Sequence, residues 1–360
     1  MCLASYDFAL PPSAIAQRPS LRRDGGRLMV VDPVSGTWRH TRFAEIGRFL
    51  RADDVLVVND SKVVPARLRG RKQSGGGVEV LLVERESRDE WTALVRVGRR
   101  PPLGATIEFG SDLRGTWVAN CGGGRARLRL AADGDLEATV ARVGEVPLPP
   151  YIRRPFGPDS DDRERYQTVY AREPGSIAAP TAGLHFSPEL MEELRQRGIT
   201  IVPLTLHVGP ATFQPVRTED VAKHTLEGER YRIPDDTAAT VSAARKAGRR
   251  VIAVGTTTTR ALEAAAEADG TIRPGDGLAR IVIRPGYRFR VIAGLITNFH
   301  LPRSSLLLVV AALLGRELVQ RCYRGALAEG YRFYSYGDAM LAADQGQLGE
   351  ASSAHFTVGT

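Results

Sequence analysis

Short runs that alternate between apolar and polar residues fill the chain from residue 67 to residue 146. In such runs every second side chain can face a core, which is the pattern of a β-strand. Glycine clusters at 75–77 and 122–124 separate several of the runs and favour turns. The six expected strands cover residues 78–83, 91–97, 105–109, 113–118, 125–130 and 136–140. Six short strands with closely spaced turns predict a small antiparallel β-barrel.

On both sides of this region, buried strands alternate with helices. Before it, the pattern predicts strands at 28–31 and 55–58 and a short helix at 43–50. After it, Ser187 can cap a helix that begins at Pro188 and ends at Gly198. The later expected elements are strands at 199–208, 250–254, 279–283 and 291–296, and helices at 237–247, 260–268 and 304–317. This order predicts an α/β fold with a mostly parallel or mixed sheet flanked by helices.

The change of pattern predicts two domains. Residues 1–66 and 147–360 are expected to form a discontinuous α/β catalytic domain, into which residues 67–146 are inserted as an antiparallel β-barrel domain. Pro147, Pro149 and Pro150 follow the barrel region, and proline cannot donate to a strand ladder. We therefore place the second domain boundary at these prolines.

Composition narrows the class of protein but not its partner. Of 360 residues, 43% are hydrophobic and 25% are charged, as in soluble globular proteins. The net charge of +8 favours anionic partners such as nucleic acid, but only four of the 49 basic residues are lysines. An arginine bias of the genome explains that skew equally well. An RNA-binding surface and an ordinary solvated surface therefore both stay open.

Cysteine usage and apolar runs predict a cytoplasmic protein without a membrane segment. Cys2, Cys121 and Cys322 are scattered, so neither a disulfide framework nor a thiolate zinc site is expected. The longest apolar run, residues 306–314, is much shorter than the roughly 20 residues that span a bilayer. The first thirty residues contain no apolar stretch of signal-peptide type.

The segment APTAGLHF, at 179–186, precedes an expected helix start. Its small residues, among them Thr181 and Gly183, allow a ligand to approach the backbone. His185 could act as a base there, although a hydrogen-bonded structural histidine in a turn is the simpler interpretation. In TLHVG, at 205–209, His207 lies near the end of an expected strand, where ligands collect in open α/β sheets. A buried histidine with its hydrogen bonds satisfied is the alternative.

The segment VGTTTTR, at 254–260, combines a buried strand, a glycine turn and hydroxyls that enter a helix. Gly255, Thr256, Thr257 and Arg260 could hold ribose hydroxyls or a carboxylate, whereas simple capping by threonine is the alternative. The segment has neither the P-loop pattern nor the GxGxxG dinucleotide pattern. A nucleotide-dependent enzyme that binds phosphate here is therefore poorly supported.

Two further segments offer polar side chains near the same expected sheet edge. Asn298 and His300, in TNFHLP at 297–302, provide an amide and an imidazole, or else only satisfy a turn. In YSYGDAM, at 334–340, Asp338 beside Tyr334 and Tyr336 could hold a cation. An aromatic core strand followed by a helix that Asp338 caps is the alternative.

Neither a metal site nor a serine hydrolase is expected from the spacing of the remaining motifs. The six histidines are dispersed without HxxxH or HExxH spacing, and GxSxG is absent. From the residues alone, the chain is expected to be a soluble α/β enzyme that binds a small ligand.

Motifs along nearly the whole chain show a resemblance to a known family. They include YDFALP (6–11), NDSKVVPAR (59–67), PLPPYI (147–152) and YQTVYA (166–171), in addition to the five segments above. In this order they resemble the S-adenosylmethionine:tRNA ribosyltransferase-isomerase family.

The resemblance implies an α/β domain with an inserted β-barrel, and the chemistry that goes with it. The ribosyl part of S-adenosylmethionine, a consumed co-substrate, would move to the aminomethyl-deazaguanine base in the anticodon loop of tRNA. Adenine and methionine would leave, and epoxyqueuosine would form. We expect a monomer that uses no metal.

Residue roles follow from that reaction as hypotheses. His185, His207 and His300 are candidates for the base that removes a proton beside the sulfonium. Thr256, Thr257 and Asn298 are candidates for binding ribose hydroxyls or the methionine carboxylate. Asp338, Tyr334 and Tyr336 could offset the sulfonium charge. Lys62, Arg67, Arg153 and Arg154 are candidates for binding tRNA phosphates.

Two segments depart from the family pattern. The family usually has Gly-Leu-Gly-Thr-Phe where this chain has residues 209–213, GPATF, and a His-Ser-Glu run where this chain has residues 225–227, TLE. Two alternatives therefore stay open. One is a related enzyme that uses S-adenosylmethionine with another acceptor, and the other is an RNA-binding descendant with weak catalysis.

Overall fold

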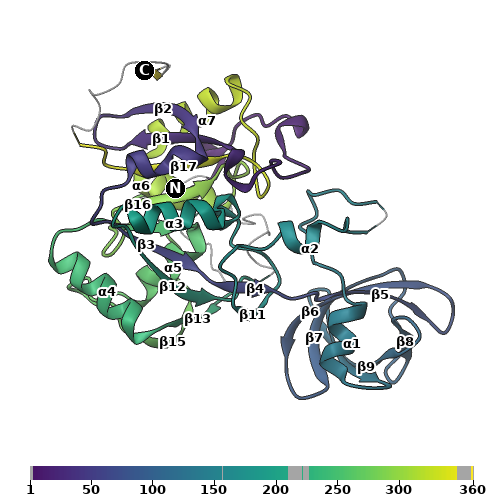
Figure 1. Ribbon diagram of the computed structural model, residues 1–360. Helices are drawn as coiled ribbons and strands as arrows, with labels where there is room; N and C mark the ends of the chain where they lie inside the picture. Colours follow the sequence, from purple (N-terminus) through teal and green to yellow (C-terminus); the bar gives the residue numbers. More distant parts are fainter. Residues whose placement is uncertain (1–2, 156, 210–220, 222–226, 347–357, 360) are drawn as a thin grey trace.

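A ten-stranded mixed sheet forms the larger body of the computed structural model, which describes residues 3–155, 157–209, 221, 227–346 and 358–359 (Figure 1). Its strand order is β15-β13-β12-β3-β14-β16-β17-β1-β2-β18. The central strands β12 (Thr200–Leu206), β3 (Val55–Asn59), β14 (Val251–Val254) and β16 (Gly294–Asn298) are parallel to one another. The predicted mixed sheet is confirmed.

Strands of both directions complete the sheet on either side. Strand β17 (Ala339–Ala343) is antiparallel to β16 and parallel to β1 (Arg27–Asp32), which is followed by β2 (Thr37–Arg42) and β18 (Val358–Gly359). At the other end, β13 (Glu229–Ile233) and β15 (Gly275–Ala279) are antiparallel additions. Every residue of β3, β14, β16 and β17 is buried, because helices cover both faces of the sheet.

The two faces of the sheet carry different helices. On one face, Val57 and Leu206 share a core with α4 (Asp235–Lys246), α5 (Thr256–Ala265), α6 (Ser305–Leu314) and α7 (Arg316–Ala328). On the other face, Val58 and Val254 pack with α3 (Pro188–Gln196) and the 3-10 helix η4 (Phe43–Phe49). As expected, the Ser187 side chain caps α3 by accepting a hydrogen bond from the Leu190 amide. No helix within the described ranges is long and apolar enough to cross a membrane.

A closed six-stranded antiparallel barrel lies to one side of the sheet (Figure 1). In chain order its strands are β5 (Arg67–Lys72), β6 (Gly77–Arg85), β7 (Glu90–Val97), β8 (Thr106–Glu108), β9 (Leu113–Gly122) and β10 (Arg125–Ala132). Its core contains Leu68, Val80, Phe109 and Trp117, all with almost no exposed surface. The predicted barrel is confirmed, whereas the proposed domain limits at 66/67 and 146/147 stay a prediction.

One predicted barrel strand is wrong. Residues 136–140 belong to helix α1 (Leu136–Val143), because Asp135 caps it and Leu136, Val140 and Val143 recur at helical spacing against the barrel core. The sixth strand is β5, where arginine occupies alternate positions and Leu68 is the buried apolar residue. A two-stranded parallel sheet of β4 (Ser61–Val63) and β11 (Glu173–Ser176) lies between barrel and sheet.

Several other expected limits shift by a few residues. Helix α5 begins at Thr256 instead of residue 260, and β15 ends at Ala279, where the expected strand began. Strand β16 begins at Gly294, because the amides of Val291 and Ile292 bind the Glu263 carboxylate and not a neighbouring strand. The apolar helix at 304–317 is two helices, α6 and α7, that meet at Gly315 with a φ of +79°.

Candidate active site

A pocket lies at the edge of the sheet where the parallel strands β12, β14 and β16 end. Ligands bind at this edge in open α/β sheets. The residues around the pocket include Tyr151, Thr181, Val208, Gly255, Thr256, Thr257, Asn298, His300, Tyr334 and Ser335. Each of the five segments singled out in the sequence contributes at least one of them.

The sharp turn from β14 into α5 forms one wall of the pocket. Gly255 has a φ of +95°, a conformation that residues with a Cβ rarely adopt, and its amide donates to the Ile296 carbonyl at 2.8 Å. The Thr258 and Thr259 hydroxyls donate back to the Val254 and Gly255 carbonyls. Among the described residues no side chain caps α5, so the amides of its first turn, beside the pocket-lining Thr256 and Thr257, have no capping acceptor.

Asn298, the last residue of β16, connects three of the predicted segments. Its side-chain amide nitrogen lies 3.0 Å from Nε2 of His185 and donates to the Tyr334 carbonyl at 3.2 Å. Its side-chain oxygen accepts a hydrogen bond from the Thr181 hydroxyl at 3.1 Å. With every polar atom engaged, the amide has a fixed orientation in the pocket wall.

The two buried histidines of the site occupy different layers. His300 lines the pocket, and its Nε2 lies 2.8 Å from the Thr297 hydroxyl. His185 lies behind Asn298, stacked on the Phe43 ring at 4.9 Å between centroids. Burial lowers the pKa of His300 to about 3. Burial also lowers the pKa of His185 to about 4, against the opposing charge of Asp338, so both imidazoles are neutral at neutral pH.

Acid is expected to destabilise the protein steeply as the pH falls from about 6.5 toward 4. In the unfolded chain both histidines regain a pKa near 6.5, so below that pH the unfolded chain binds more protons than the folded one. The free energy of unfolding should then fall by about 3 kcal/mol per pH unit for the two groups together. Urea unfolding across this range measures the slope. A His300→Gln variant should show about half of it, and an unchanged slope in that variant would contradict the assignment.

Two tyrosines, Tyr151 and Tyr334, form an aromatic part of the pocket wall. The Tyr151 and Tyr334 rings meet edge to face with centroids 3.8 Å apart, and the Tyr151 hydroxyl lies 2.5 Å from the Ser335 hydroxyl. Tyr334 has a φ of +75°, an unusual conformation for a residue with a side chain, and unusual backbone conformations cluster at functional sites. Burial raises the pKa of Tyr334 to about 12, so the phenol stays protonated. The sequence prediction did not include Tyr151 and Ser335, although PLPPYI ends beside the first of them.

Four predicted ligand-binding residues make contacts elsewhere and do not line the pocket. The Arg260 guanidinium forms a buried ion pair with Glu229 at 2.5 Å and donates to the Ala279 carbonyl. A Cβ at Gly183 would lie only 2.0 Å from the Tyr170 hydroxyl, so that glycine serves close packing.

The other two belong to the YSYGDAM segment. Asp338 accepts hydrogen bonds from the Arg27 and Arg332 amides, and the Tyr336 hydroxyl donates to Asp162. Strand β17, not a helix, follows Asp338, so the capping alternative is wrong.

His207 is set apart from the pocket at the end of β12. Its ring packs against Gly175, where a Cβ would lie 2.9 Å from the imidazole. Burial lowers its pKa, with Glu173 and Asp60 opposing the shift. The next residue, Val208, lines the pocket, since successive side chains of an extended segment face opposite sides.

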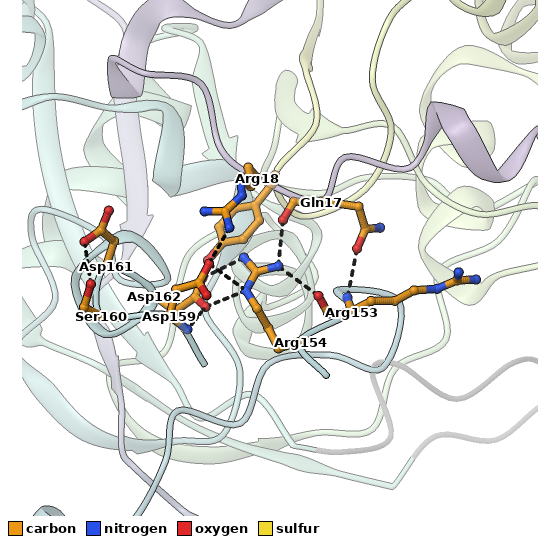
Figure 2. A network of polar contacts seen from close by, with 9 residues as sticks. Gln17, Arg18, Arg153, Arg154, Asp159, Ser160, Asp161 and Asp162 are labelled. Carbon is orange, nitrogen blue, oxygen red and sulfur yellow. Dashed lines mark hydrogen bonds and ion pairs between the residues drawn. The ribbon is translucent and has the colours of Figure 1, made fainter. Parts of the chain in front are cut away.

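The four predicted phosphate-binding residues divide into two pairs. The Arg154 guanidinium is enclosed by both Asp162 oxygens, at 2.8 and 3.0 Å, and by the Gln17 carbonyl, whereas the Arg153 side chain points away from this network (Figure 2). Arg67 is mostly buried and donates to the Leu148 carbonyl. Arg153 and Lys62 are exposed, so these two present charge to solvent.

Parts of the two departures from the family pattern, residues 210–213 and 225–226, lie outside the described residues. Within the described part of the chain, no group of three or more histidine, cysteine or acidic side chains is arranged to hold a metal ion.

Comparison with known proteins gives matches across almost the whole chain. A family model described as a queuosine biosynthesis protein matches residues 3–342. The S-adenosylmethionine:tRNA ribosyltransferase-isomerases of Moorella thermoacetica and Syntrophotalea carbinolica are 51% and 49% identical to the chain, over 348 and 343 residues. Each alignment covers 95% of this chain and 99% of the relative. The crystal structure of an S-adenosylmethionine tRNA ribosyltransferase from Thermotoga maritima matches with a TM-score of 0.53 and 32% identity, over 94% of this chain and 99% of that one. The similarity therefore includes both the sheet and the barrel.

Proposed function

Since the chain belongs to the S-adenosylmethionine:tRNA ribosyltransferase-isomerase family, we propose that the pocket beside Asn298 is where it binds S-adenosylmethionine. The enzyme transfers and isomerises the ribosyl unit of S-adenosylmethionine onto a deazaguanine base of tRNA, in queuosine biosynthesis. The resemblance seen in the sequence motifs is confirmed by these matches. The observation that carries the proposal is the convergence of all five motif segments on one pocket.

The pocket offers what a sulfonium substrate requires. The Tyr151 and Tyr334 rings can face the positive sulfur, and ring faces attract cations. Asp338 is a weaker candidate for this role, because two backbone amides already occupy its carboxylate. The Thr181 hydroxyl and the Asn298 side-chain oxygen have lone pairs beyond their mutual hydrogen bond, so both can accept hydrogen bonds from ribose hydroxyls.

The reaction begins with loss of a proton from the ribose carbon that the sulfonium acidifies. His300 is the best-placed base, since it lines the pocket and is neutral. The electron pair left on that carbon forms the carbon–carbon bond of the new ring, and the lone pair of the tRNA amine forms the carbon–nitrogen bond, after which the amine loses a proton. Methionine leaves with the electron pair of the carbon–sulfur bond, and adenine leaves with that of the glycosidic bond and takes up a proton. The amine must be neutral to attack, and the apolar surface of Pro180 and Leu306 disfavours its protonated form. The hydroxyls of Tyr151 and Ser335 are donors that can assist adenine departure.

The proposal also includes the position of the acceptor base in tRNA, the phosphate contacts, the oligomeric state and the compartment. The acceptor base lies in the anticodon loop, the exposed Lys62 and Arg153 contribute to phosphate binding, and the enzyme works as a monomer in the cytoplasm without a metal.

An adenine-release assay tests the function directly. Incubation with S-adenosylmethionine and tRNA that carries the aminomethyl-deazaguanine base should release adenine and methionine in equal amounts. Release only with another acceptor would support the alternative of a related enzyme that uses S-adenosylmethionine with a different acceptor. Tight tRNA binding with no turnover under any condition would support the alternative of an RNA-binding descendant with weak catalysis.

Replacement of His300 by glutamine should lower kcat by about 10²–10⁴-fold, the usual contribution of a positioned base, with a smaller effect on KM. His40→Gln is the control, because His40 is a half-buried histidine that is hydrogen-bonded to Tyr331 and does not line the pocket. A His207→Gln variant forms the third arm of the experiment. If His207→Gln lost activity while His300→Gln stayed fully active, His207 at the end of β12 would be the base.

A further inference from the structure

The four consecutive threonines at the start of α5 differ in how their hydroxyls are satisfied. Thr258 and Thr259 donate to backbone carbonyls one turn earlier. Thr257 Oγ1 has no hydrogen-bond partner among the described residues, although Thr257 is only 6% exposed and lines the pocket. A buried hydroxyl without a partner costs free energy, and a ligand that accepts its hydrogen bond would recover that cost.

The surroundings of Thr257 provide donors and a positive electrostatic potential. Within the described part of the chain, the first amides of α5 have no intrahelical acceptor and no side-chain cap. The N-terminal end of a helix carries a partial positive charge, which favours an anionic oxygen group. Among the described residues that line the pocket, none is acidic and none is an arginine or a lysine. The start of α5 is therefore the part of the described pocket wall best suited to an anion.

S-adenosylmethionine has one anionic group, its carboxylate, and two cationic ones. From these observations, and resting on the proposed function, we propose that Thr257 and the first amides of α5 form the subsite for the methionine carboxylate. The methionine end then lies against α5. The sulfonium lies away from the positive end of the helix, on the side of Tyr151 and Tyr334. A tRNA phosphate has similar oxygen chemistry, but the burial of Thr257 within the pocket favours the small co-substrate.

Two substrates and two variants test the subsite. Adenine release is measured with saturating tRNA, using S-adenosylmethionine or its decarboxylated analogue. The wild type should prefer the carboxylate-bearing substrate in kcat/KM by at least tenfold. Thr257→Val should lose about tenfold to a hundredfold with S-adenosylmethionine, the usual effect of a hydrogen bond to a charged group, and little with the analogue. Thr257→Ser, which keeps the hydroxyl, should behave like the wild type.

The unfolding midpoint separates ligand binding from a structural role. Without ligand, Thr257→Val should be at least as stable as the wild type, because a methyl group replaces a buried hydroxyl without a partner. A lower midpoint, an equal loss with both substrates, or a wild type without preference would overturn the subsite. So would a loss confined to tRNA affinity, which would indicate a phosphate. A wild type that releases no adenine from S-adenosylmethionine would instead refute the proposed function.

Discussion

Replacement of Asn298 by leucine is expected to lower kcat/KM for S-adenosylmethionine by a factor of about 10³ or more. Leucine has a similar shape but removes the donor to His185 and to the Tyr334 carbonyl, and the acceptor for Thr181. Loss of one positioned donor commonly costs a factor of about 10²–10³, and here the neighbouring groups lose their orientation as well. Each buried partner left unpaired also costs about 1–3 kcal/mol of stability. Steady-state adenine release and urea unfolding measure the two effects.

Asn59→Leu is the matched control for this experiment. Asn59 is fully buried at the end of β3, which β14 separates from β16. It donates to the Leu206 carbonyl, accepts from the Leu206 and Ser61 amides, and does not line the pocket. Its replacement should lower stability comparably and leave the activity of the folded molecules within about tenfold of the wild type. If Asn298→Leu kept wild-type activity, or if both variants lost activity equally, the pocket would not be the reaction site.

The barrel was predictable from the sequence because buried residues recur at every second position in parts of β6, β9 and β10. Strand β5 was not, since its arginines leave Leu68 as the buried apolar residue and its position depends on pairing with β6 and β8. Residues 136–140 were predicted to form a strand, although they belong to helix α1. A five-residue window cannot distinguish strand from helix, and the decisive cap at Asp135 and the contact at Val143 lie outside it.

The location of the pocket was more predictable than the role of each side chain. Glycine turns and polar residues at strand ends mark the sheet edge, and every marked segment reaches the pocket. Within a segment, however, distant partners decide where a side chain points. Arg260 faces Glu229, and Tyr336 faces Asp162, which is 174 residues away in the sequence. No local pattern carries that information. Tyr151 was missed for the same reason, because its place beside Tyr334 depends on chain segments that only the fold brings together.

Removal of the Asp54 carboxylate should have the largest effect on stability without affecting the chemistry. Asp54 and Arg250 form a bidentate ion pair with N–O distances of 2.6 and 2.8 Å, and their side chains are 0% and 6% exposed. They precede β3 and β14, at the edge of the sheet opposite the pocket. Asp54→Ala leaves a buried guanidinium without its counter-charge, which should lower the free energy of unfolding by about 3–5 kcal/mol. Urea unfolding at neutral pH measures this change.

The double variant Asp54→Leu, Arg250→Met decides whether the unpaired charge causes the loss. Because the desolvation cost of a buried ion pair offsets much of its attraction, two apolar residues should restore a large part of the lost stability. Glu267→Ala provides the exposed counterpart: its pair with Arg273 is 52% and 68% exposed, and its loss should cost less than about 1 kcal/mol. The folded fraction of every variant should release adenine at the wild-type rate, since none of these residues lines the pocket. If the double variant were no more stable than Asp54→Ala, the lost stability would come from the lost hydrogen bonds at this edge of the sheet and not from the unpaired charge.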